Sequence, residues 1–299
     1  MSKAPELDIG LVVAAHGRHC VVEDPEGSRL ICHTRGKKSD IVVGDHVRWQ
    51  VSGDAGVIEG VEPRRNVLTR QDEWKTKSFA ANLDQLLVIV AAEPVFSESQ
   101  LARALIAAED AAIPARILLN KADLASVAAA RVRLAPYVAM GIEVHEVALK
   151  AHPLQARALL EPLLADKASL AIGPSGAGKS TLINLLAPHA KAQVGEVSIA
   201  LNAGRHTTTA THWYWLTEQR RTALIDSPGF QEFGMRQIDV QQLAALMPDL
   251  RSHTGGCKFY NCTHLHEPGC AVREALQRGE IHESRYRIYV EILGELVRR

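Results

Sequence analysis

The chain has 299 residues, of which 46% are hydrophobic, and it carries 34 basic and 34 acidic side chains. This composition excludes a disordered chain and allows one large domain or two to three smaller ones. The balanced charge excludes a global positive field, so any contact with nucleic acid must come from local basic patches. The longest apolar run, LLVIVAA at 86–92, is far shorter than the ~20 residues that span a bilayer. The N-terminus lacks the pattern of a secretory signal, so we expect a cytoplasmic protein without a membrane contact.

The first part of the chain, residues 1–72, reads as short runs of β-forming residues that glycines and Pro25 interrupt. This spacing predicts about five strands and no long helix, and a small β-barrel is the natural way to close them. An SH3-like and an OB-like barrel both fit the pattern. Such a barrel either binds a partner or serves only as a structural cap of the protein.

Residues 73–233 alternate between strand and helix patterns after an expected link at QDEWKTKSFA (71–80). Expected strands at 86–92, 115–119 and 169–173 are separated by expected helices, as in a parallel sheet with helices on both faces. Functional loops should then lie at the carboxyl ends of the strands. Residues 234–299 show a third, helical pattern around a Cys/His segment, so we expect three domains.

The segment GPSGAGKST (173–181) has the spacing of a phosphate-binding loop between a strand and a helix. Its glycines let backbone N–H groups surround a β-phosphate, while Lys179 adds positive charge and the Ser180 hydroxyl ligates Mg²⁺. A glycine-rich turn that only caps a helix is the weaker alternative. The residues expected to bind the nucleotide here are Gly173, Pro174, Ser175, Gly176, Ala177, Gly178, Lys179, Ser180 and Thr181.

A second loop, Asn120-Lys121-Ala122-Asp123, follows the expected strand at 115–119. The Asp123 carboxylate can accept hydrogen bonds from the N1–H and the exocyclic amine of guanine, a pattern that adenine does not offer. We expect Asn120 to bridge this loop to the purine and the Lys121 stem to cover the base. The alternative is that Asn and Asp in this loop only mark the start of the following helix. The phosphate-binding loop in the same domain favours guanine.

Two further segments complete a predicted GTPase site. RTALIDSPGF (221–230) ends a strand in Asp-x-x-Gly, where Asp226 can hold Mg²⁺ and the Gly229 N–H can sense the γ-phosphate. GRHTTT (204–209) is a polar loop suited to a nucleotide-dependent switch, with Thr208 as a further Mg²⁺ ligand, although many such loops are only turns. In many GTPases, the residue after Asp-x-x-Gly is a glutamine that orients the attacking water. Phe230 stands at this position and its apolar side chain cannot orient water, so hydrolysis should be slow unless another group does so.

We predict catalytic roles for Lys179 and Asp226, and His206 is the best candidate within the chain for the missing group. A solvated histidine without a role is the alternative. The base loop comes before the phosphate loop in the chain, which is the reverse of the familiar order of these two motifs, and the switch loop and Asp226 follow them. Because the carboxyl ends of a parallel sheet converge wherever the termini lie, circular permutation is the simplest explanation.

The C-terminal part contains Cys257-x4-Cys262-x-His264-x5-Cys270, a Cys₃His set suited to tetrahedral Zn²⁺. His266 competes with His264 for the fourth position, and reduced cysteines without a metal are the alternative. Because all four ligands come from the protein, we expect one closed, structural zinc site that stabilises a small helical module.

The barrel, NKAD, GPSGAGKST, GRHTTT, DSPGF and CKFYNCTHLHEPGCAV, in this order, resemble the ribosome small-subunit-dependent GTPase A family (RsgA) of bacteria. The resemblance implies an OB-fold, a circularly permuted GTPase domain and a zinc domain, with GTP, Mg²⁺ and one Zn²⁺. It also implies late maturation of the 30S subunit and stimulated hydrolysis to GDP. We expect contact with 16S rRNA and a monomeric protein. By the same resemblance, His264 rather than His266 holds the zinc, and His206 acts in catalysis.

The chain departs from the usual GTPase pattern in VALKAH, which matches the Ser-Ala-Lys loop only loosely at Lys150. Three other functions compete with the one that the resemblance implies. They are a GTPase of the large subunit, an RNA-binding assembly factor that only senses GTP, and an ATP-using kinase. Local basic groups suited to phosphate, or simply to solvent, are Arg35, Lys37, Lys38, Arg64, Arg65 and Arg70.

Overall fold

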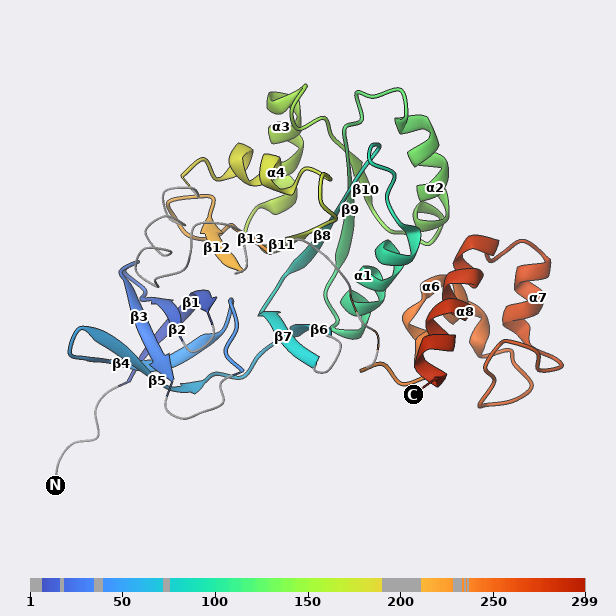
Figure 1. The fold of residues 1–299 in the computed structure, drawn as a ribbon, viewed down its shortest axis with the longest axis horizontal. Coiled ribbons are helices and arrows are strands. Elements are labelled where there is room, and N and C mark those ends of the chain that lie inside the picture. Colours follow the sequence, from blue (N-terminus) through green and yellow to red (C-terminus); the bar gives the residue numbers. More distant parts are fainter. Residues whose placement is uncertain are drawn as a thin grey trace.

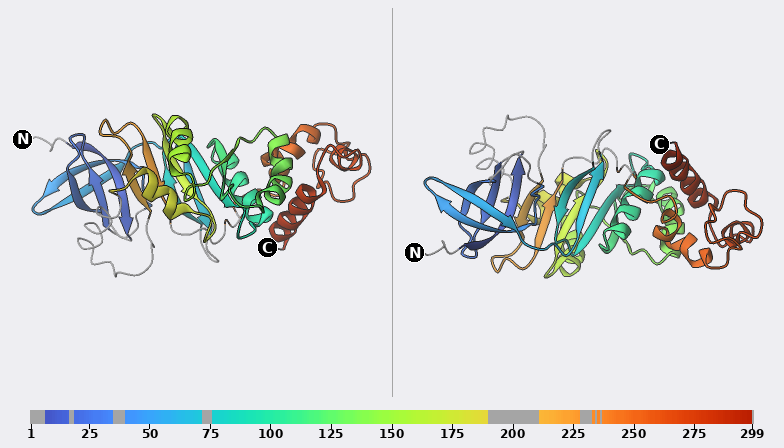
Figure 2. Two further views of the ribbon diagram at one scale, coloured as in Figure 1. Left: turned by 90° about the horizontal axis from the view of Figure 1, so that it is seen from above. Right: turned by 90° about the horizontal axis from the view of Figure 1, so that it is seen from below.

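A computed structural model describes residues 7–16, 19–34, 40–71, 76–189, 211–227, 233, 235 and 237–298. Three parts follow one another along the molecule, as Figures 1 and 2 show. A β-barrel lies at one end, an α/β sheet lies in the middle and a group of helices lies at the other end. In the described part of the chain, no helix is both long and apolar enough to span a membrane.

The barrel consists of β1 (Asp8–His16), β2 (His19–Glu23), β3 (Arg29–Thr34), β4 (His46–Ser52) and β5 (Ala55–Val61). The strands are ordered β1-β2-β3-β5-β4, and β4 pairs back with β1 to close the barrel. Only the β3–β5 pairing is parallel, which is the connectivity of an OB-fold. The OB-like alternative is therefore the correct one. The interior is filled by Val12, Cys20, Val22, Cys32, Val47, Trp49 and Ile58.

A β-hairpin, rather than the expected link, follows the barrel. Its strands are β6 (Val67–Gln71) and β7 (Thr76–Ala81), which pair antiparallel. Leu68 and Ala80 lie opposite each other in this hairpin and are both fully buried in the largest apolar core. The sequence did not predict the second strand, because most residues of QDEWKTKSFA are polar and only the end of the strand, FAA, carries apolar side chains.

The central sheet contains β8 (Gln85–Ala91), β9 (Ala115–Asn120), β10 (Val144–Glu146), β11 (Ala168–Ile172), β12 (His212–Trp215) and β13 (Ala223–Asp226). Their spatial order is β10-β9-β8-β11-β13-β12, and all neighbours are parallel except β12 and β13. The strand before the phosphate-binding loop, β11, thus lies in the middle of the sheet although it is late in the chain. This arrangement confirms the predicted circular permutation.

In the described part of the chain, four helices cover the two faces of this sheet. They are α1 (Glu98–Asp110), α2 (Val127–Ala139), α3 (Pro153–Leu164) and α4 (Lys179–Leu186). Alternate residues of β8 face opposite sides, as the period of a strand requires. Val88 and Val90 pack in the cluster that contains α1 and α2, whereas Leu87 and Ile89 pack with α3 and α4.

The barrel and the central sheet are joined at β1 and β12. Ala14 pairs with His212, so the two sheets form one continuous sheet. Glu23 of the barrel is buried and accepts a hydrogen bond from the Trp215 indole at 2.7 Å. Arg29 pairs with the same carboxylate at 2.7 Å. The strand that follows the expected switch loop is therefore fixed to the barrel.

The C-terminal helices pack beside α1 and α2 (Figure 1). They are the 3₁₀ helix η1 (Leu243–Leu246) and the α-helices α6 (Pro248–Thr254), α7 (Ala271–Gln277) and α8 (Glu283–Val297). Arg103 of α1 contacts Glu291 and Glu295 of α8 at 3.3 and 2.5 Å. Arg285, only 2% exposed, pairs with Asp249 at 3.0 Å and lies over the Tyr137 ring at 4.9 Å.

Candidate functional site

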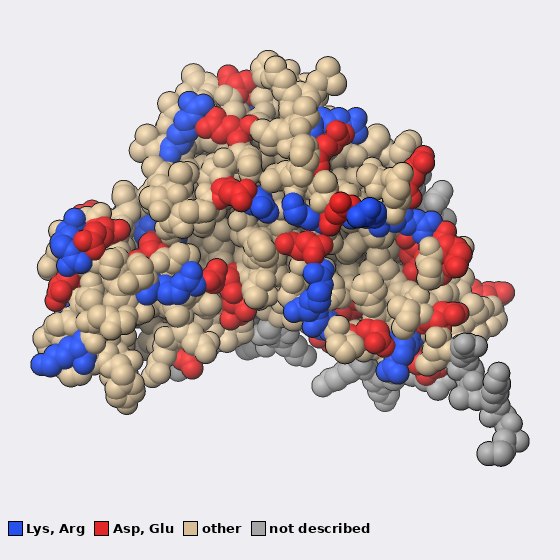
Figure 3. All heavy atoms as spheres, turned by 180° about the vertical axis from the view of Figure 1, so that it is seen from behind, with Lys and Arg blue, Asp and Glu red and all other residues tan. Residues whose placement is uncertain are grey.

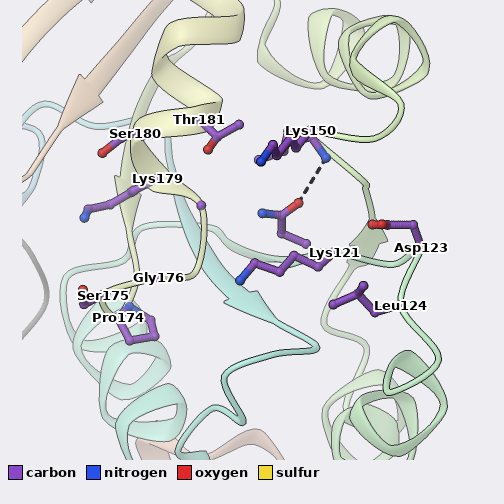
Figure 4. A pocket seen from close by; sticks show the side chains of 13 residues that line it. Lys121, Asp123, Leu124, Lys150, Pro174, Ser175, Gly176, Lys179, Ser180 and Thr181 are labelled. Carbon is purple, nitrogen blue, oxygen red and sulfur yellow. Dashed lines mark hydrogen bonds between the residues drawn. The ribbon is translucent and has the colours of Figure 1, made fainter.

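A pocket of about 600 Å³ lies at the carboxyl ends of β9 and β11, where the two predicted nucleotide loops meet (Figure 4). The loop after β9 forms one wall and the loop between β11 and α4 forms the other. This volume is typical of a pocket for a small-molecule ligand. Ten residues predicted to bind GTP line it: Asn120, Lys121, Asp123, Pro174, Ser175, Gly176, Gly178, Lys179, Ser180 and Thr181.

Close packing of the phosphate loop explains two of its glycines. Gly178 has φ 111°, and a Cβ atom there would lie 2.1 Å from the Asn120 side-chain nitrogen. A Cβ atom at Gly173 would lie 2.4 Å from the Ile89 carbonyl oxygen. Helix α4 starts directly after Gly178, so its unpaired N–H groups border the pocket. A helix N-terminus in this position favours a bound anion such as phosphate.

The two loops are joined by the buried side chain of Asn120. Its amide donates to the Ala177 carbonyl at 2.8 Å, and its oxygen accepts from the Leu149 N–H at 3.1 Å. The second of these bonds is the dashed line in Figure 4. Asn120 therefore sets the distance between the base loop and the phosphate loop, and it also holds the segment that carries Lys150.

Lys121 and Asp123 stand on the wall opposite the phosphate loop (Figure 4). The Lys121 ammonium donates to the Glu93 carbonyl at 2.6 Å, so its aliphatic stem extends from the base loop toward the segment that follows β8. Within the described part of the chain, the exposed carboxylate of Asp123 has no partner and is available to a ligand. The Ala122 N–H donates to the Val147 carbonyl at 3.1 Å, which anchors the loop from behind.

Asp226 ends β13, and its backbone lies opposite Ala171 of the phosphate-loop strand. Burial raises the pKa of its carboxyl to about 6, while the Lys179 ammonium and a hydrogen bond from the Ser227 N–H act in the opposite direction. The ionised carboxylate is thus incompletely compensated by the chain alone. A divalent cation would compensate it, and carboxylate with hydroxyl oxygen is the ligand set that Mg²⁺ prefers.

The remaining predicted residues lie behind the pocket or outside the described residues. Ala122, Gly173 and Ala177 support the loops without lining the pocket. His206, Thr208, Gly229 and Phe230 are outside the described residues. Leu124, Leu149 and Lys150 line the pocket although they were not predicted to bind GTP. Leu149 acts through its backbone, which side-chain patterns do not report, and only the loose match in VALKAH pointed to Lys150.

The second site is a Cys₃His metal-binding cluster between α6 and α7. One ligand atom from each of Cys257, Cys262, His264 and Cys270 lies within 4.8 Å of the others. The His264 Nδ1 atom is 3.5 Å from the Cys257 sulfur and 3.4 Å from the Cys270 sulfur. With Zn–S and Zn–N bonds of about 2.3 and 2.1 Å, tetrahedral ligand atoms are about 3.6–3.8 Å apart. The donor set therefore fits Zn²⁺.

Hydrogen bonds from α8 and within the loop position this cluster. The Tyr286 hydroxyl donates to the His264 carbonyl at 2.6 Å, and the Tyr289 hydroxyl donates to the Thr263 carbonyl at 2.8 Å. His264 is buried at 5% exposure, whereas His266 is exposed and outside the cluster. The geometry thus groups His264, and not its competitor, with the three cysteines.

Comparison with known proteins finds relatives that match most of this chain. A family model described as RsgA GTPase matches residues 61–236. A protein of Variovorax paradoxus named small ribosomal subunit biogenesis GTPase RsgA is 61% identical over 97% of this chain and 93% of its own. A protein of the same name from Burkholderia pseudomallei (strain K96243) is 51% identical over 96% of this chain and 91% of its own.

Two solved structures have the same fold over almost the whole chain. The crystal structure of YloQ, described as a circularly permuted GTPase, covers 98% of this chain and 96% of its own, with a TM-score of 0.72 and 27% identity. The crystal structure of YjeQ from Thermotoga maritima covers 98% of this chain and 100% of its own, with a TM-score of 0.75 and 30% identity. The chain therefore belongs to the RsgA GTPase family.

Proposed function

We propose that this chain binds the small (30S) ribosomal subunit, assists its late maturation and hydrolyses GTP to GDP and phosphate with stimulation by the subunit. The names of the relatives in Variovorax and Burkholderia support the ribosomal role. The observation that carries the proposal is the pocket in which Asn120 joins the base loop to the phosphate loop. A base reader and a phosphate cradle in one pocket fit a guanine nucleotide.

In this proposal, the base loop selects guanine. The unpartnered carboxylate of Asp123 accepts the N1–H and the exocyclic amine, and an adenine base would leave it unpaired. The stem of Lys121 covers the base. The phosphate loop, residues 173–181, surrounds the phosphates with backbone N–H groups, and Gly229 contacts the γ-phosphate.

The hydrolytic step takes place at the phosphate end of the pocket. Lys179 stabilises negative charge on the β- and γ-phosphates, and Ser180, Thr208 and Asp226 would hold Mg²⁺. When bound, Mg²⁺ neutralises charge on the phosphate oxygens. His206 is the residue that we assign to orienting the attacking water, since Phe230 cannot form a hydrogen bond through its side chain. The subunit would complete this arrangement.

The Cys₃His cluster would hold one structural Zn²⁺. Because the four ligands come from one short segment beside small helices, the ion would fix a module with little apolar core of its own. We place the domain boundaries at residues 1–72, 73–233 and 234–299. We also propose that the protein acts as a monomer in the cytoplasm and contacts 16S rRNA.

Co-sedimentation with purified ribosomal subunits tests the ribosomal part of the proposal. We expect the chain loaded with a non-hydrolysable GTP analogue to sediment with small subunits and not with large subunits. We also propose that hydrolysis releases the protein from the subunit, so the GDP-loaded chain should sediment less with small subunits. Equal binding to both subunits would contradict the assignment to the small subunit.

A further inference from the structure

The loop that carries the metal ligands also presents two aromatic side chains to solvent. Between Cys257 and Cys262, the residues Lys258, Phe259, Tyr260 and Asn261 form a short turn, here called the aromatic tip. Tyr260 is 100% exposed and Phe259 is 41% exposed. Among the side chains that the structure describes, these two are the only exposed large aromatic ones. The two rings are neighbours in the chain, so they offer adjacent flat apolar surfaces to a partner.

The aromatic tip is held in place from both ends. The Lys258 N–H donates to the Gly269 carbonyl at 2.9 Å, and the Cys262 N–H donates to the Phe259 carbonyl at 3.3 Å. Two metal ligands, Cys257 and Cys262, directly flank it. A ring on such a fixed turn loses little conformational freedom when it binds a partner. The C-terminal helices that flank this loop lie at the end of the molecule opposite the barrel (Figure 2).

The aromatic tip includes one basic side chain. The Lys258 ammonium lies 5.6 Å from the centre of the Phe259 ring. The only acidic residue between Cys257 and Cys270 is Glu267, and its two oxygens accept hydrogen bonds within the loop. One oxygen accepts from the Thr263 N–H and hydroxyl, and the other accepts from the Leu265 and His266 N–H groups. The negative charge of Glu267 is therefore compensated by hydrogen bonds within the loop.

One face of the molecule carries charges of both signs. On the face in Figure 3, basic and acidic side chains are interspersed, without a wide area of one sign. The net charge of the whole chain is also zero. Attraction to the phosphate backbone over a wide area of this face is therefore weak. A local contact that stacks bases and neutralises single phosphates suits this surface better.

We propose that Phe259 and Tyr260 form a stacking platform for unpaired RNA bases, with Lys258 contacting a neighbouring phosphate. Every base has a flat π-face, so rings exposed on a rigid turn can stack on it regardless of sequence. A base-paired helix offers no free base faces, so the partner is a single-stranded loop or bulge. This inference rests on the proposed function, because it takes the RNA to be that of the small subunit.

A photocrosslink identifies the partner directly. Tyr260 is replaced by p-benzoylphenylalanine, another aromatic side chain, in the full chain loaded with a non-hydrolysable GTP analogue. After irradiation with small subunits, we expect the crosslink on RNA, at nucleotides that are unpaired. Crosslinks found only on ribosomal proteins, or only on paired nucleotides, would overturn the proposal.

Affinity measurements with the same subunits test the energetic role. The variant Tyr260→Ala should bind small subunits about tenfold more weakly, as loss of one stacked base implies, and Tyr260→Phe should retain binding. The matched control is Leu154→Ala, which shortens a side chain that is 82% exposed on α3 and should have no effect. Unchanged zinc content shows that each variant keeps its loop.

Two results separate this inference from the proposed function. If the wild type binds small subunits and Tyr260→Ala binds them equally well, the stacking platform is wrong while the proposed function stands. If the wild type does not bind small subunits, the proposed function and this inference both fail.

Discussion

The side-chain amide of Asn120 donates to the carbonyl of Ala177 at 2.8 Å, so the loop expected to read the base is tied directly to the loop expected to hold phosphates. These residues are 57 positions apart in the chain. The bond exists because β9 and β11 are separated only by β8 in the sheet and their carboxyl ends meet at one edge. Nucleotide binding at one loop is thereby coupled to the position of the other.

Replacing Asn120 by alanine should weaken nucleotide binding. The change leaves the Leu149 N–H and the Ala177 carbonyl unpaired in a buried place, which costs about 1–3 kcal/mol per group. We expect the affinity for a fluorescent GDP analogue to fall about tenfold or more in a titration. Asn66→Ala is the control, because Asn66 also bonds a backbone N–H and carbonyl, those of Leu83, away from the pocket. Equal losses in both variants would show that only stability had changed.

Replacing Asp123 by asparagine should change the base preference. Asparagine offers an amide donor where guanine needs an acceptor, and xanthine carries an oxygen where guanine has its amine. We expect the affinity for GTP to fall about 100-fold or more and the affinity for xanthosine triphosphate to rise. Competition against a labelled nucleotide measures both, with Asp54→Asn in the exposed β4–β5 turn as control. An unchanged preference for GTP would remove Asp123 from base recognition.

Replacing His264 by alanine should remove the metal and loosen the C-terminal module. His264 is a buried ligand, whereas His266, two residues later, is exposed and outside the cluster. Elemental analysis should find about one zinc per chain in the wild type and in His266→Ala, and little or none in His264→Ala. Nucleotide affinity should be retained, because the pocket lies in the central part. Zinc loss in the His266 variant alone would reverse the ligand assignment.

Replacing Arg285 by alanine should destabilise the contact between α8, α6 and α2. Arg285 and Asp249 are both buried, so the variant leaves an unpaired carboxylate in the interior. Breaking a buried pair in this way costs about 3–5 kcal/mol, and a lower thermal unfolding midpoint should report it. The control is Arg278→Ala, which breaks the exposed Arg278–Glu280 pair and should not change the midpoint. Equal midpoints for the wild type and Arg285→Ala would contradict this account.

The sequence was sufficient for the elements whose chemistry is local. Two sites each lie within one short segment, the phosphate loop at residues 173–181 and the Cys/His cluster at residues 257–270. The spacing of their glycines, cysteines and histidine was therefore enough to predict their geometry. Several strands of the sheet, among them β8, β9, β11 and β13, were also predictable, because runs such as LLVIVAA at 86–92 are buried on both faces, whereas β12 was not predicted. The OB-like barrel and the SH3-like barrel have similar strand patterns, so strand pairing alone distinguishes them.

Features that depend on distant partners could not be predicted. The β7 strand is recognisable only by its pairing with β6 and by the burial of Ala80. The pairing of β1 with β12 and the hydrogen bond from Trp215 to Glu23 join residues about 190 positions apart. The contact of the Leu149 N–H with Asn120 uses the backbone, which any residue could supply. In each of these cases, tertiary structure decides what the local pattern leaves open.

The measurement that tests the central claim most directly is steady-state GTP hydrolysis by the purified chain, alone and with isolated small or large subunits, with ATP as the control substrate. The account predicts a low basal rate, because Phe230 replaces the usual glutamine, and a rise of about tenfold or more with small subunits only. A rate that neither subunit changes, or one that large subunits raise equally, would contradict a GTPase whose active site the small subunit completes.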